Sequence, residues 1–364
     1  MPKKNSIIYF TKYSEKGASS RYRSYQYRNK LNKEFNLLFY PLFYENYTDD
    51  LNKKRSKNKL LILRGYLLRV FQVLSLLRTK KIVFIEYELL PYFPPLLELL
   101  LYKSGVKMVF DYDDAIFHNY DMHPNKLIRF LYQNKIKTII KYASHVITGS
   151  PYLTSYVNLH TKRISEIPTS INLSLYDYKL DNILKKKIFV IAWIGSSTTS
   201  MNLLNLKDVF VKLFHIDSSI KLKLMGFDKS LVGEFRVPNI EFCDWSPQAE
   251  LSLLKEMDLG IMPLEDNPFN RGKCGFKLIQ YMGMGKPTIS SPLPANIKIN
   301  RDNSNLFAEN NHEWFSSILN VRNNPDYFRM IGYRNIAIVE KYYSVETNYN
   351  EYVKIFKELQ YVRN

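Results

Sequence analysis

The sequence has few of the features that mark disulfide-rich or membrane-spanning proteins. Its 364 residues include only two cysteines, Cys243 and Cys274, too few for a disulfide framework or a cysteine-based zinc site. No uncharged apolar run approaches the ~18 residues that a transmembrane helix needs. The apolar run near the start, Ile7 to Phe10, is too short for the core of an export signal. We therefore expect a protein of the reducing cell interior.

Acidic residues are scarce, and their shortage lies in the first half. The chain has 52 Lys and Arg against 34 Asp and Glu, for a formal charge of +18. Residues 1–187 hold 32 basic and 15 acidic side chains, whereas residues 188–364 hold 20 and 19. We expect the first half to face an anionic surface, either nucleic acid or membrane phosphates.

The segment 51–85 concentrates this charge, with ten basic side chains and no acid. A helical pattern at 60–78 follows the polybasic run Lys53, Lys54, Arg55, Lys57 and Lys59. On a helical projection, one face carries Leu63, Tyr66, Leu67, Val70, Val73, Leu74 and Leu77, and the other carries Arg64, Gln72, Ser75 and Arg78. This helical pattern has three interpretations. It is an ordinary surface helix of an α/β domain, an interfacial helix on anionic lipid, or part of a nucleic-acid surface rich in tyrosine.

Short apolar runs alternate with helical patterns along the whole chain. Such alternation is typical of parallel sheets with helical crossovers, and the length suggests two domains at about 150 residues each. We predict an α/β protein of two Rossmann-like, doubly wound units, with ligands at the carboxyl ends of the strands in the cleft between them. The strand candidates are SIIYF, FNLLFY, KIVFIE, VKMVFD, IFVIAWIG, IKLKLMGF, NIEFCDW, DLGIMPL and KPTISS.

The stretch 258–291 indicates a strand, a glycine-bearing loop, an amphipathic helix and a second strand. Arg271 and Lys273 lie in the loop, Gly275 allows close approach to the backbone, and Lys277 falls in the first helical turn. Backbone N–H groups at a helix start, with cations beside them, favour a diphosphate. The alternative is that the apolar spacing from Phe276 onward is only a buried helix face and that Lys277 is solvated.

Six segments carry a resemblance to a known family: 17–23, 109–117, 146–150, 191–196, 258–264 and, most specifically, 272–287. Together they resemble the retaining nucleotide-sugar glycosyltransferases of family 4, which have the GT-B fold. The resemblance implies transfer of a sugar from a nucleotide diphosphate to an acceptor hydroxyl with retention, with no cofactor and no protein-bound metal. It also implies an acceptor-binding domain 1–172, a linker 173–187, a nucleotide-sugar-binding domain 188–344, and a C-terminal helix 345–364 that packs back on the first domain.

The resemblance assigns donor residues, with two departures. Members typically carry two glutamates eight residues apart, and here those positions hold Gly272 and Gln280. Gln280 would then contact the ribose through its amide. The nucleobase is expected near Asp244 and Trp245, although Trp245 could equally be plain packing. The diphosphate would be held by Gly195, Ser196, Ser197, Arg271, Lys273, Gly275, Phe276 and Lys277, with Lys273 also counted as catalytic because it would neutralise the leaving phosphate.

Asp111, Asp113 and Asp114 follow a strand of the first half. In the family the corresponding loop often ends in His-Asp beneath the transferred sugar, and Asp113 takes the His position. We expect Asp113 or Asp114 to touch the sugar or the acceptor hydroxyl. On the acceptor side we expect Gly17, Ser20, Arg21 and Arg23, whose alternative is the solvated first turn of a helix.

These expectations describe a glycosyltransferase of polysaccharide or cell-envelope biosynthesis, peripheral on the cytoplasmic face of the membrane. Its acceptor would be a phosphate-bearing glycan or a lipid-linked precursor, and its partners would include an anionic membrane surface but no nucleic acid. Two alternatives remain. One is a metal-dependent enzyme of the GT-A type that uses Asp111 and Asp113 to hold a cation. The other is a non-catalytic basic protein that binds nucleic acid or lipid, consistent with the missing acids at Gly272 and Gln280.

Overall fold

The structure is a computed structural model that describes residues 4–52, 55–77, 79, 81–176, 188–235 and 237–361. It divides into two compact units. Unit 1 comprises Met1–Ser170, Arg271–Cys274 and Val345–Asn364, and unit 2 comprises Ile171–Asn270 and Gly275–Ser344. Most of the predicted linker 173–187 lies outside the described residues, as do Lys53, Lys54 and Arg78.

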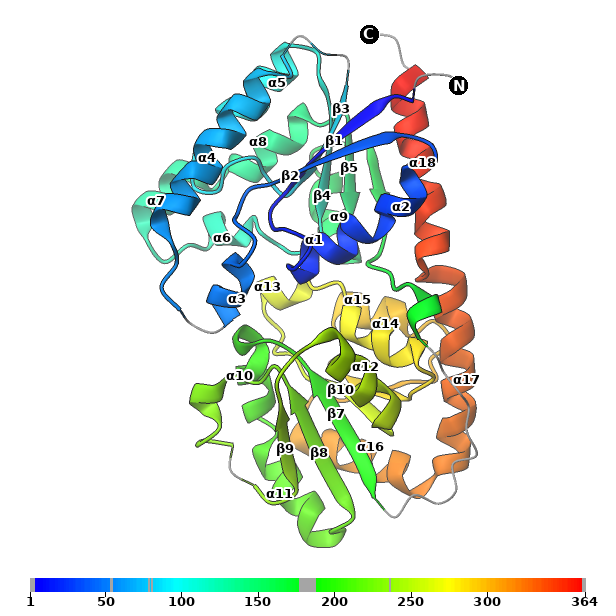
Figure 1. The fold of residues 1–364 in the computed structure, drawn as a ribbon. Coiled ribbons are helices and arrows are strands. Elements are labelled where there is room, and N and C mark those ends of the chain that lie inside the picture. The colour runs from blue at the N-terminus through cyan, green and yellow to red at the C-terminus, as the bar shows by residue number, and fades with distance from the viewer. Residues whose placement is uncertain are drawn as a thin grey trace. The chain divides into compact units, whose positions relative to one another are not determined.

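Unit 1 is built on a six-stranded parallel sheet (Figure 1). The strand order is β2-β1-β3-β4-β5-β6, and each strand pairs in parallel with its neighbours. The strands are β1 (Ser6–Thr11), β2 (Asn36–Pro41), β3 (Ile82–Glu86), β4 (Lys107–Tyr112), β5 (His145–Thr148) and β6 (Ile164–Glu166). The helices are α1 (Ala18–Arg23), η1 (Tyr25–Tyr27), α2 (Arg28–Leu31), α3 (Tyr47–Asn52), α4 (Lys59–Leu74), α5 (Leu96–Lys103), α6 (His118–Asp121), α7 (Lys126–Tyr132), α8 (Lys135–Tyr142), α9 (Pro151–Asn158) and α18 (Val345–Tyr361).

Helices cover both faces of this sheet, which is why its central strands are continuous apolar runs rather than alternating ones. One core joins the sheet to α4, α5, α8 and α9, through residues such as Val73 and Leu101. The other core joins it to α2 and the C-terminal helix α18, whose Phe356 meets Tyr9 and Phe84 edge-on. Every residue of β3 is buried, as expected for a strand in the middle of such a sandwich.

Unit 2 has a second six-stranded parallel sheet, in the order β12-β11-β10-β7-β8-β9 (Figure 1). Its strands are β7 (Phe189–Ile194), β8 (Ile220–Met225), β9 (Ile240–Cys243), β10 (Leu259–Met262), β11 (Thr288–Ser290) and β12 (Leu306–Phe307). Its helices are η2 (Leu173–Leu175), η3 (Ser197–Thr199), α10 (Ser200–Leu204), α11 (Lys207–Ile216), η4 (Lys229–Leu231), α12 (Pro247–Glu256), α13 (Pro268–Arg271), α14 (Phe276–Gly283), α15 (Pro294–Ile299), α16 (Asn311–Asn323) and α17 (Pro325–Tyr342). The predicted α/β class, with two parallel sheets, is confirmed.

Each sheet reverses its strand order once. In unit 1 the chain runs outward from β1 to β2 and then returns to β3 on the other side of β1. In unit 2 the reversal lies between β7 and β10. Loops at the carboxyl ends of the two strands beside such a reversal diverge to opposite faces of the sheet, so they leave a crevice in which ligands of this architecture bind.

The helix predicted at 60–78 exists as α4, and it buries only part of the face that the helical projection grouped as apolar, including Val73. Leu63, Leu67 and Leu74 are exposed, whereas Arg69 is buried. The guanidinium of Arg69 donates to the carbonyls of Thr11 (3.1 Å) and Tyr40 (2.8 Å) at the ends of β1 and β2. Strand-end carbonyls need donors, and Arg69 supplies them from the helix face that meets the sheet. Within the described residues no helix has the length and apolar character required to cross a bilayer.

Candidate functional site

Asp113 lies at the carboxyl edge of the first sheet, directly after β4. Its carboxylate accepts hydrogen bonds from Ser19 of α1 (2.9 Å to Oδ2) and from the phenol of Tyr87, the residue that follows β3. Tyr87 has φ of 61°, a left-handed conformation that costs a residue with a side chain about 1 kcal/mol or more. Three loops, after β1, β3 and β4, therefore converge on one carboxylate beside the reversal of strand order.

The surroundings of Asp113 disfavour its charged form. Burial and, next in size, the neighbouring carboxylate of Asp114 raise the pKa of Asp113 to about 6, against the opposite effect of Arg23. A carboxyl with a pKa near 6 changes its charge close to neutral pH, which suits a group that contacts a reacting hydroxyl.

Asp114 is paired with Lys273 within unit 1, at 3.0 Å between Oδ1 and Nζ. Burial alone would lower the pKa of Lys273, but the charge and hydrogen bond of Asp114 outweigh it, so the pKa is raised and the ammonium is kept. Beside this pair, the Cys274 thiol donates to the carbonyl of Asp113 (2.9 Å), and the carbonyl of Gly272 accepts from Ser150 (3.3 Å). Residues 271–274 are thus anchored to the loop that follows β4, which places a cation next to both predicted catalytic acids.

Arg23 and Asp111 form a buried ion pair, and this corrects two predictions. The Nε of Arg23 donates to Oδ2 of Asp111 at 2.9 Å, a second nitrogen donates to Oδ1, and Nη1 donates to the carbonyl of Ile167. Both side chains are 1% exposed. The expected grip of Arg23 on an acceptor phosphate is wrong, because its donors face the interior. Asp111 is likewise engaged with Arg23 rather than paired with Asp113 toward a cation.

The rest of the acceptor loop divides between interior and surface. Ser20 is buried, donates to the carboxylate of Glu86 and accepts from the backbone of Tyr13 (3.0 Å), so its predicted acceptor contact is also wrong. Gly17 is buried at the start of α1. Arg21 is half-buried, with its guanidinium 4.8 Å from the ring of Tyr22. Ser20 and Arg23 are buried, so Arg21 is the one predicted acceptor-side residue whose polar side chain is partly exposed. Its contact with the acceptor stays a prediction.

Glu86 gives unit 1 a pH-dependent stability. Its carboxylate accepts from Ser20, from Ser24 and from the backbone N–H of Lys12 (2.9 Å), yet burial raises its pKa from 4.5 to about 7. Because the folded protein holds this proton more tightly than the unfolded chain, the associated stability is complete below pH 4.5 and is lost as the pH rises through 7. A difference of this size corresponds to about 3 kcal/mol.

We therefore expect Glu86→Gln to flatten the pH dependence of stability. Between about pH 5 and 8, the free energy of unfolding of the wild type should fall by about 3 kcal/mol more than that of the variant, measured by urea unfolding. Glu358→Gln, which changes an exposed glutamate of α18, is the control and should follow the wild type. If the free energy of unfolding changed with pH in the same way for Glu86→Gln and the wild type, Glu86 would not be the source of the pH dependence.

In unit 2, the loop after β7 carries Gly195, Ser196 and Ser197. A side chain at Gly195 would collide with Trp193, since a Cβ there would lie 2.1 Å from the indole ring. The N–H of Gly195 donates to the carbonyl of Met225 (3.0 Å), and that of Ser196 donates to the hydroxyl of Thr199 (3.0 Å). The backbone N–H groups of Gly195 and Ser196 therefore already have partners within unit 2. The predicted phosphate contacts would then come from the side-chain hydroxyls of this loop and from Ser197 at the start of η3.

The helix predicted to start near Gly275 is α14. Gly275 precedes the helix with φ of 65°, which favours glycine, and a Cβ there would lie 2.3 Å from Ile299. Phe276 and Lys277 form the first turn, with Nζ of Lys277 5.8 Å from the centre of the Phe276 ring. Both are half-buried. The positive end of the helix dipole and a lysine thus occur together, as an anion site requires.

Gln280 corrects the predicted ribose contact. Its side chain is fully buried in unit 2, where its amide donates to Glu250 (2.8 Å) and to Tyr176 (3.2 Å). The other oxygen of Glu250 accepts from the indole N–H of Trp245 at 2.7 Å. The amide nitrogen that was predicted to contact the ribose is therefore engaged within unit 2, through the same Glu250 that fixes Trp245. Its Oε1 has no hydrogen-bond partner in the structure.

The predicted base-binding residues lie at the carboxyl end of β9. Trp245 keeps 40% of its surface exposed while its N–H is fixed by Glu250, so one aromatic face is held in position at the surface. Phe242 is 39% exposed, and its ring packs against that of Phe227 in a tilted arrangement, with 5.4 Å between the ring centres. Asp244 is exposed and paired with Lys229 at 2.8 Å. An anchored, half-exposed indole fits base stacking better than plain packing does.

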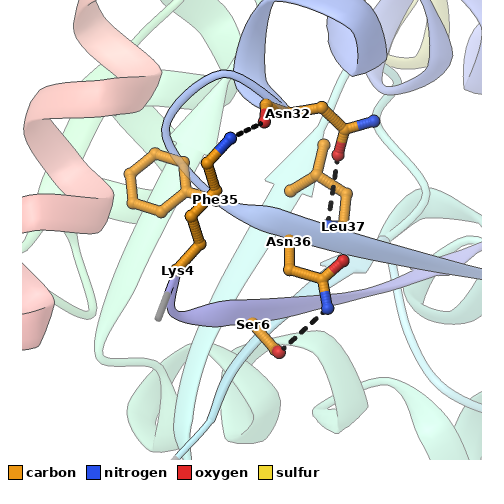
Figure 2. A pocket seen from close by; sticks show the side chains of 6 residues that line it. All are labelled: Lys4, Ser6, Asn32, Phe35, Asn36 and Leu37. Carbon is orange, nitrogen blue, oxygen red and sulfur yellow. Dashed lines mark hydrogen bonds between the residues drawn. The ribbon is translucent and has the colours of Figure 1, made fainter. Parts of the chain in front are cut away.

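Two hollows of about 480 Å³ each lie in unit 1. The first is at the amino ends of β1 and β2, away from the predicted residues, and Figure 2 shows its lining by Lys4, Ser6, Asn32, Phe35, Asn36 and Leu37. The second is at the carboxyl ends of the same strands and is bordered by Lys16, Phe43 and the first half of α4. In the part of the chain that the structure describes, no group of three or more His, Cys, Asp or Glu side chains could hold a metal ion.

Sequence reasoning missed the side chains that hold Asp113, namely Ser19 and Tyr87, and the cation Lys12. The ammonium of Lys12 lies 5.0 Å from the ring centre of Tyr87. Lys12 and Tyr87 directly follow β1 and β3, and Ser19 lies in α1, the helix after β1. All three are beside the strand reversal of unit 1, so the order of the strands was the signal that could have found them.

Comparisons with solved structures show the GT-B glycosyltransferase fold. Sucrose-phosphate synthase from Thermosynechococcus elongatus is 13% identical, with 98% of this chain and 99% of that chain covered and a TM-score of 0.73. A glycosyltransferase from Rickettsia africae ESF-5 is 14% identical, with 99% and 100% covered and a TM-score of 0.71. HepE from Anabaena, in complex with UDP-glucose, is 12% identical, with 97% and 99% covered and a TM-score of 0.71.

A sequence relative was also found. The chain is 28% identical over 86 residues to TuaH of Bacillus subtilis (strain 168), named as a glycosyltransferase of teichuronic acid biosynthesis. The match covers 23% of this chain and 22% of TuaH, so it spans about a fifth of either protein. No family model matches the chain.

Proposed function

We propose that this protein is a glycosyltransferase that moves a sugar from a nucleotide-diphosphate sugar to an acceptor hydroxyl. The GT-B fold supports the reaction class, as do the names of its structural neighbours, which include complexes with UDP and UDP-glucose. The observation that carries the proposal within the chain is the cluster Asp113, Asp114 and Lys273. It joins a carboxyl with a pKa near 6 to an ammonium stabilised by its partner.

In this proposal Lys273 neutralises the charge that develops on the leaving diphosphate, with the start of α14 and Lys277 assisting. Stabilising a leaving group by fixed cations and helix dipoles is an electrostatic mode of catalysis. Ser19 and Tyr87 orient Asp113 toward the acceptor hydroxyl or the transferred sugar. Trp245 stacks on the base. Residues of the chain carry out all these steps, without a cofactor or a protein-bound metal.

We further propose retention at the anomeric carbon, as the family 4 resemblance implies, and an acceptor of the cell envelope. TuaH supports a polysaccharide acceptor by its name. The basic excess of residues 1–187 favours a phosphate-bearing or lipid-linked precursor, handled at the cytoplasmic face of the membrane.

The sequence left two alternative functions open, a metal-dependent GT-A enzyme and a non-catalytic binder. The GT-A alternative is contradicted by the two complete parallel sheets of a GT-B fold, and Asp111 is in addition engaged by Arg23. The alternative of a non-catalytic binder rests on Gly272 and Gln280. Gln280 is a buried structural residue, so the missing glutamate at this position does not by itself remove a group from the predicted catalytic cluster.

The test is thermal unfolding of the purified protein with UDP, GDP, ADP or CMP, each with and without EDTA. A ligand at about one hundred times its dissociation constant adds about 2.7 kcal/mol, so one nucleotide should raise the melting temperature, and EDTA should not change that. Trp245→Ala should weaken the same nucleotide about tenfold, because base–aromatic stacking contributes about 1–3 kcal/mol.

Tyr333→Ala, which removes an exposed aromatic ring of α17, is the control for Trp245→Ala and should behave as the wild type. A shift that EDTA abolishes would indicate a metal-bound nucleotide. No shift with any nucleotide would favour the non-catalytic binder and refute the proposed function.

A further inference from the structure

Helix α4 presents an apolar face to solvent. We call Leu60, Leu63, Leu67, Phe71 and Leu74 the leucine face; these side chains are between 45% and 77% exposed. Their spacing of three and four residues places them along one side of the helix. The opposite side packs on the sheet through Val73 and the buried Arg69. The helix thus buries Val73 and Arg69 but leaves five large apolar side chains in solvent, so its outer face is expected to have a partner.

The apolar surface continues beyond α4. Phe93 packs against Tyr66 of α4, with 5.6 Å between ring centres, and is itself 51% exposed. Its neighbour Tyr92 contacts the ring of His123 (6.2 Å), whose Nδ1 accepts from the backbone of Asn125, the residue that caps α7. The exposed side chains added by this continuation are Tyr92, Phe93, Leu96, Leu127, Phe130 and Leu131. Connected apolar surface of this extent marks an interaction site in a soluble domain.

Exposed cations lie at the amino-terminal end of α4 and at the start of α7. Residues 51–85 contain ten Lys or Arg and no acid, and among them Arg55, Lys57, Lys59 and Arg64 are exposed. Exposed Lys126 begins α7. The nearest acids before the run are those of α3, where Asp50 accepts a hydrogen bond from Tyr44. The surface thus combines exposed leucine and phenylalanine with positive charge.

We propose that the leucine face of α4, together with Phe93 and α7, docks the protein on an anionic lipid bilayer. Apolar side chains that enter the acyl boundary, flanked by cations at the depth of the lipid phosphates, are the pattern of interfacial helices. A second copy of the chain fits less well. In a two-fold dimer each patch meets the same patch, so the basic segments would face one another and repel.

This docking extends the proposed function without depending on it. The hollow at the carboxyl ends of β1 and β2 is lined by Leu61, Arg64 and Leu68 of α4 and by Lys16 of the first loop. It therefore adjoins the docking helix. A lipid-linked acceptor held in the bilayer would meet this hollow from the same surface.

The test is partition of the full-length protein onto vesicles that contain phosphatidylglycerol, compared with vesicles of phosphatidylcholine alone. The wild type should sediment with the anionic vesicles, and added salt should weaken the binding. The double variant Leu67→Glu/Phe71→Glu should lose binding at least about tenfold, because two buried apolar contacts become charges. Both positions are more than half exposed, so the fold should tolerate the change.

Ile216→Glu is the matched control, since Ile216 is an exposed apolar residue (63%) at the end of α11 in unit 2, and it should bind as the wild type does. Equal binding to both vesicle types, or unchanged binding by the double variant, would overturn the proposal. A wild type that elutes as a dimer, with a monomeric double variant and no lipid binding, would assign the face to self-association. Nucleotide-induced thermal shifts of the same variants should match the wild type, which separates this proposal from the proposed function.

Discussion

Lys273→Ala should lower turnover by about two to three orders of magnitude, as removal of one preorganised donor to a developing oxyanion does. The lysine is held at 3.0 Å from Asp114 with a raised pKa, so it is charged at any pH at which the enzyme is assayed. Because its task is to stabilise the leaving diphosphate, the loss should fall on kcat rather than on KM. The measurement is steady-state sugar transfer from the donor that the nucleotide screen identifies.

Two variants control this experiment. Lys103→Ala removes an exposed lysine of α5 and should leave turnover unchanged. Lys273→Arg keeps the charge but not the compact ammonium, and it should retain part of the activity. The melting temperature of Lys273→Ala should stay close to that of the wild type, since its partner Asp114 is about one third exposed and can be solvated. Full activity in Lys273→Ala would exclude the lysine from the mechanism.

Arg23→Ala should destabilise the protein by about 3–5 kcal/mol, because it leaves the carboxylate of Asp111 buried without its partner. The double variant Arg23→Met/Asp111→Leu should recover most of this loss, since apolar side chains of similar volume replace a buried ion pair at little cost. Urea unfolding measures both. If the single variant does not accumulate as folded protein, the double variant still tests the pairing.

Arg28→Ala is the matched control for Arg23→Ala. Arg28 pairs with Glu15 at 3.5 Å on the surface, where both side chains are exposed, and its loss should change stability by no more than about 0.5 kcal/mol. Equal effects of Arg23→Ala and Arg28→Ala would show that the buried pair is not a structural element. Retained stability in Arg23→Ala together with weakened acceptor binding would restore the predicted acceptor role.

The alternation of apolar runs and helical patterns was enough to predict two parallel sheets, because a strand covered on both faces must be apolar along its whole length. The start of a helix beside Gly275 was also predicted from the sequence, because an amphipathic apolar spacing begins directly after this glycine. Both are local properties, carried by residues that are neighbours in the chain.

Side-chain direction within a helix was not predictable. In α1, Ser20 and Arg23 point inward to Glu86 and Asp111, whereas Ser19 points to Asp113. The orientation of α4 was equally unpredictable, because periodicity shows which residues share a face but not which face meets the sheet. The carbonyls at the ends of β1 and β2 need donors from that face, and Arg69 supplies them.

The sequence by itself determined the fold class, the excess of positive charge in the first half, and the residue types of an anion site around 271–277. Only the tertiary structure decided which charges meet. Lys273 and Asp114 are 159 residues apart, and nothing local brings them together. It also decided that Arg23, Asp111 and Gln280 serve the interior, because a buried polar group must find its partner wherever the fold places one.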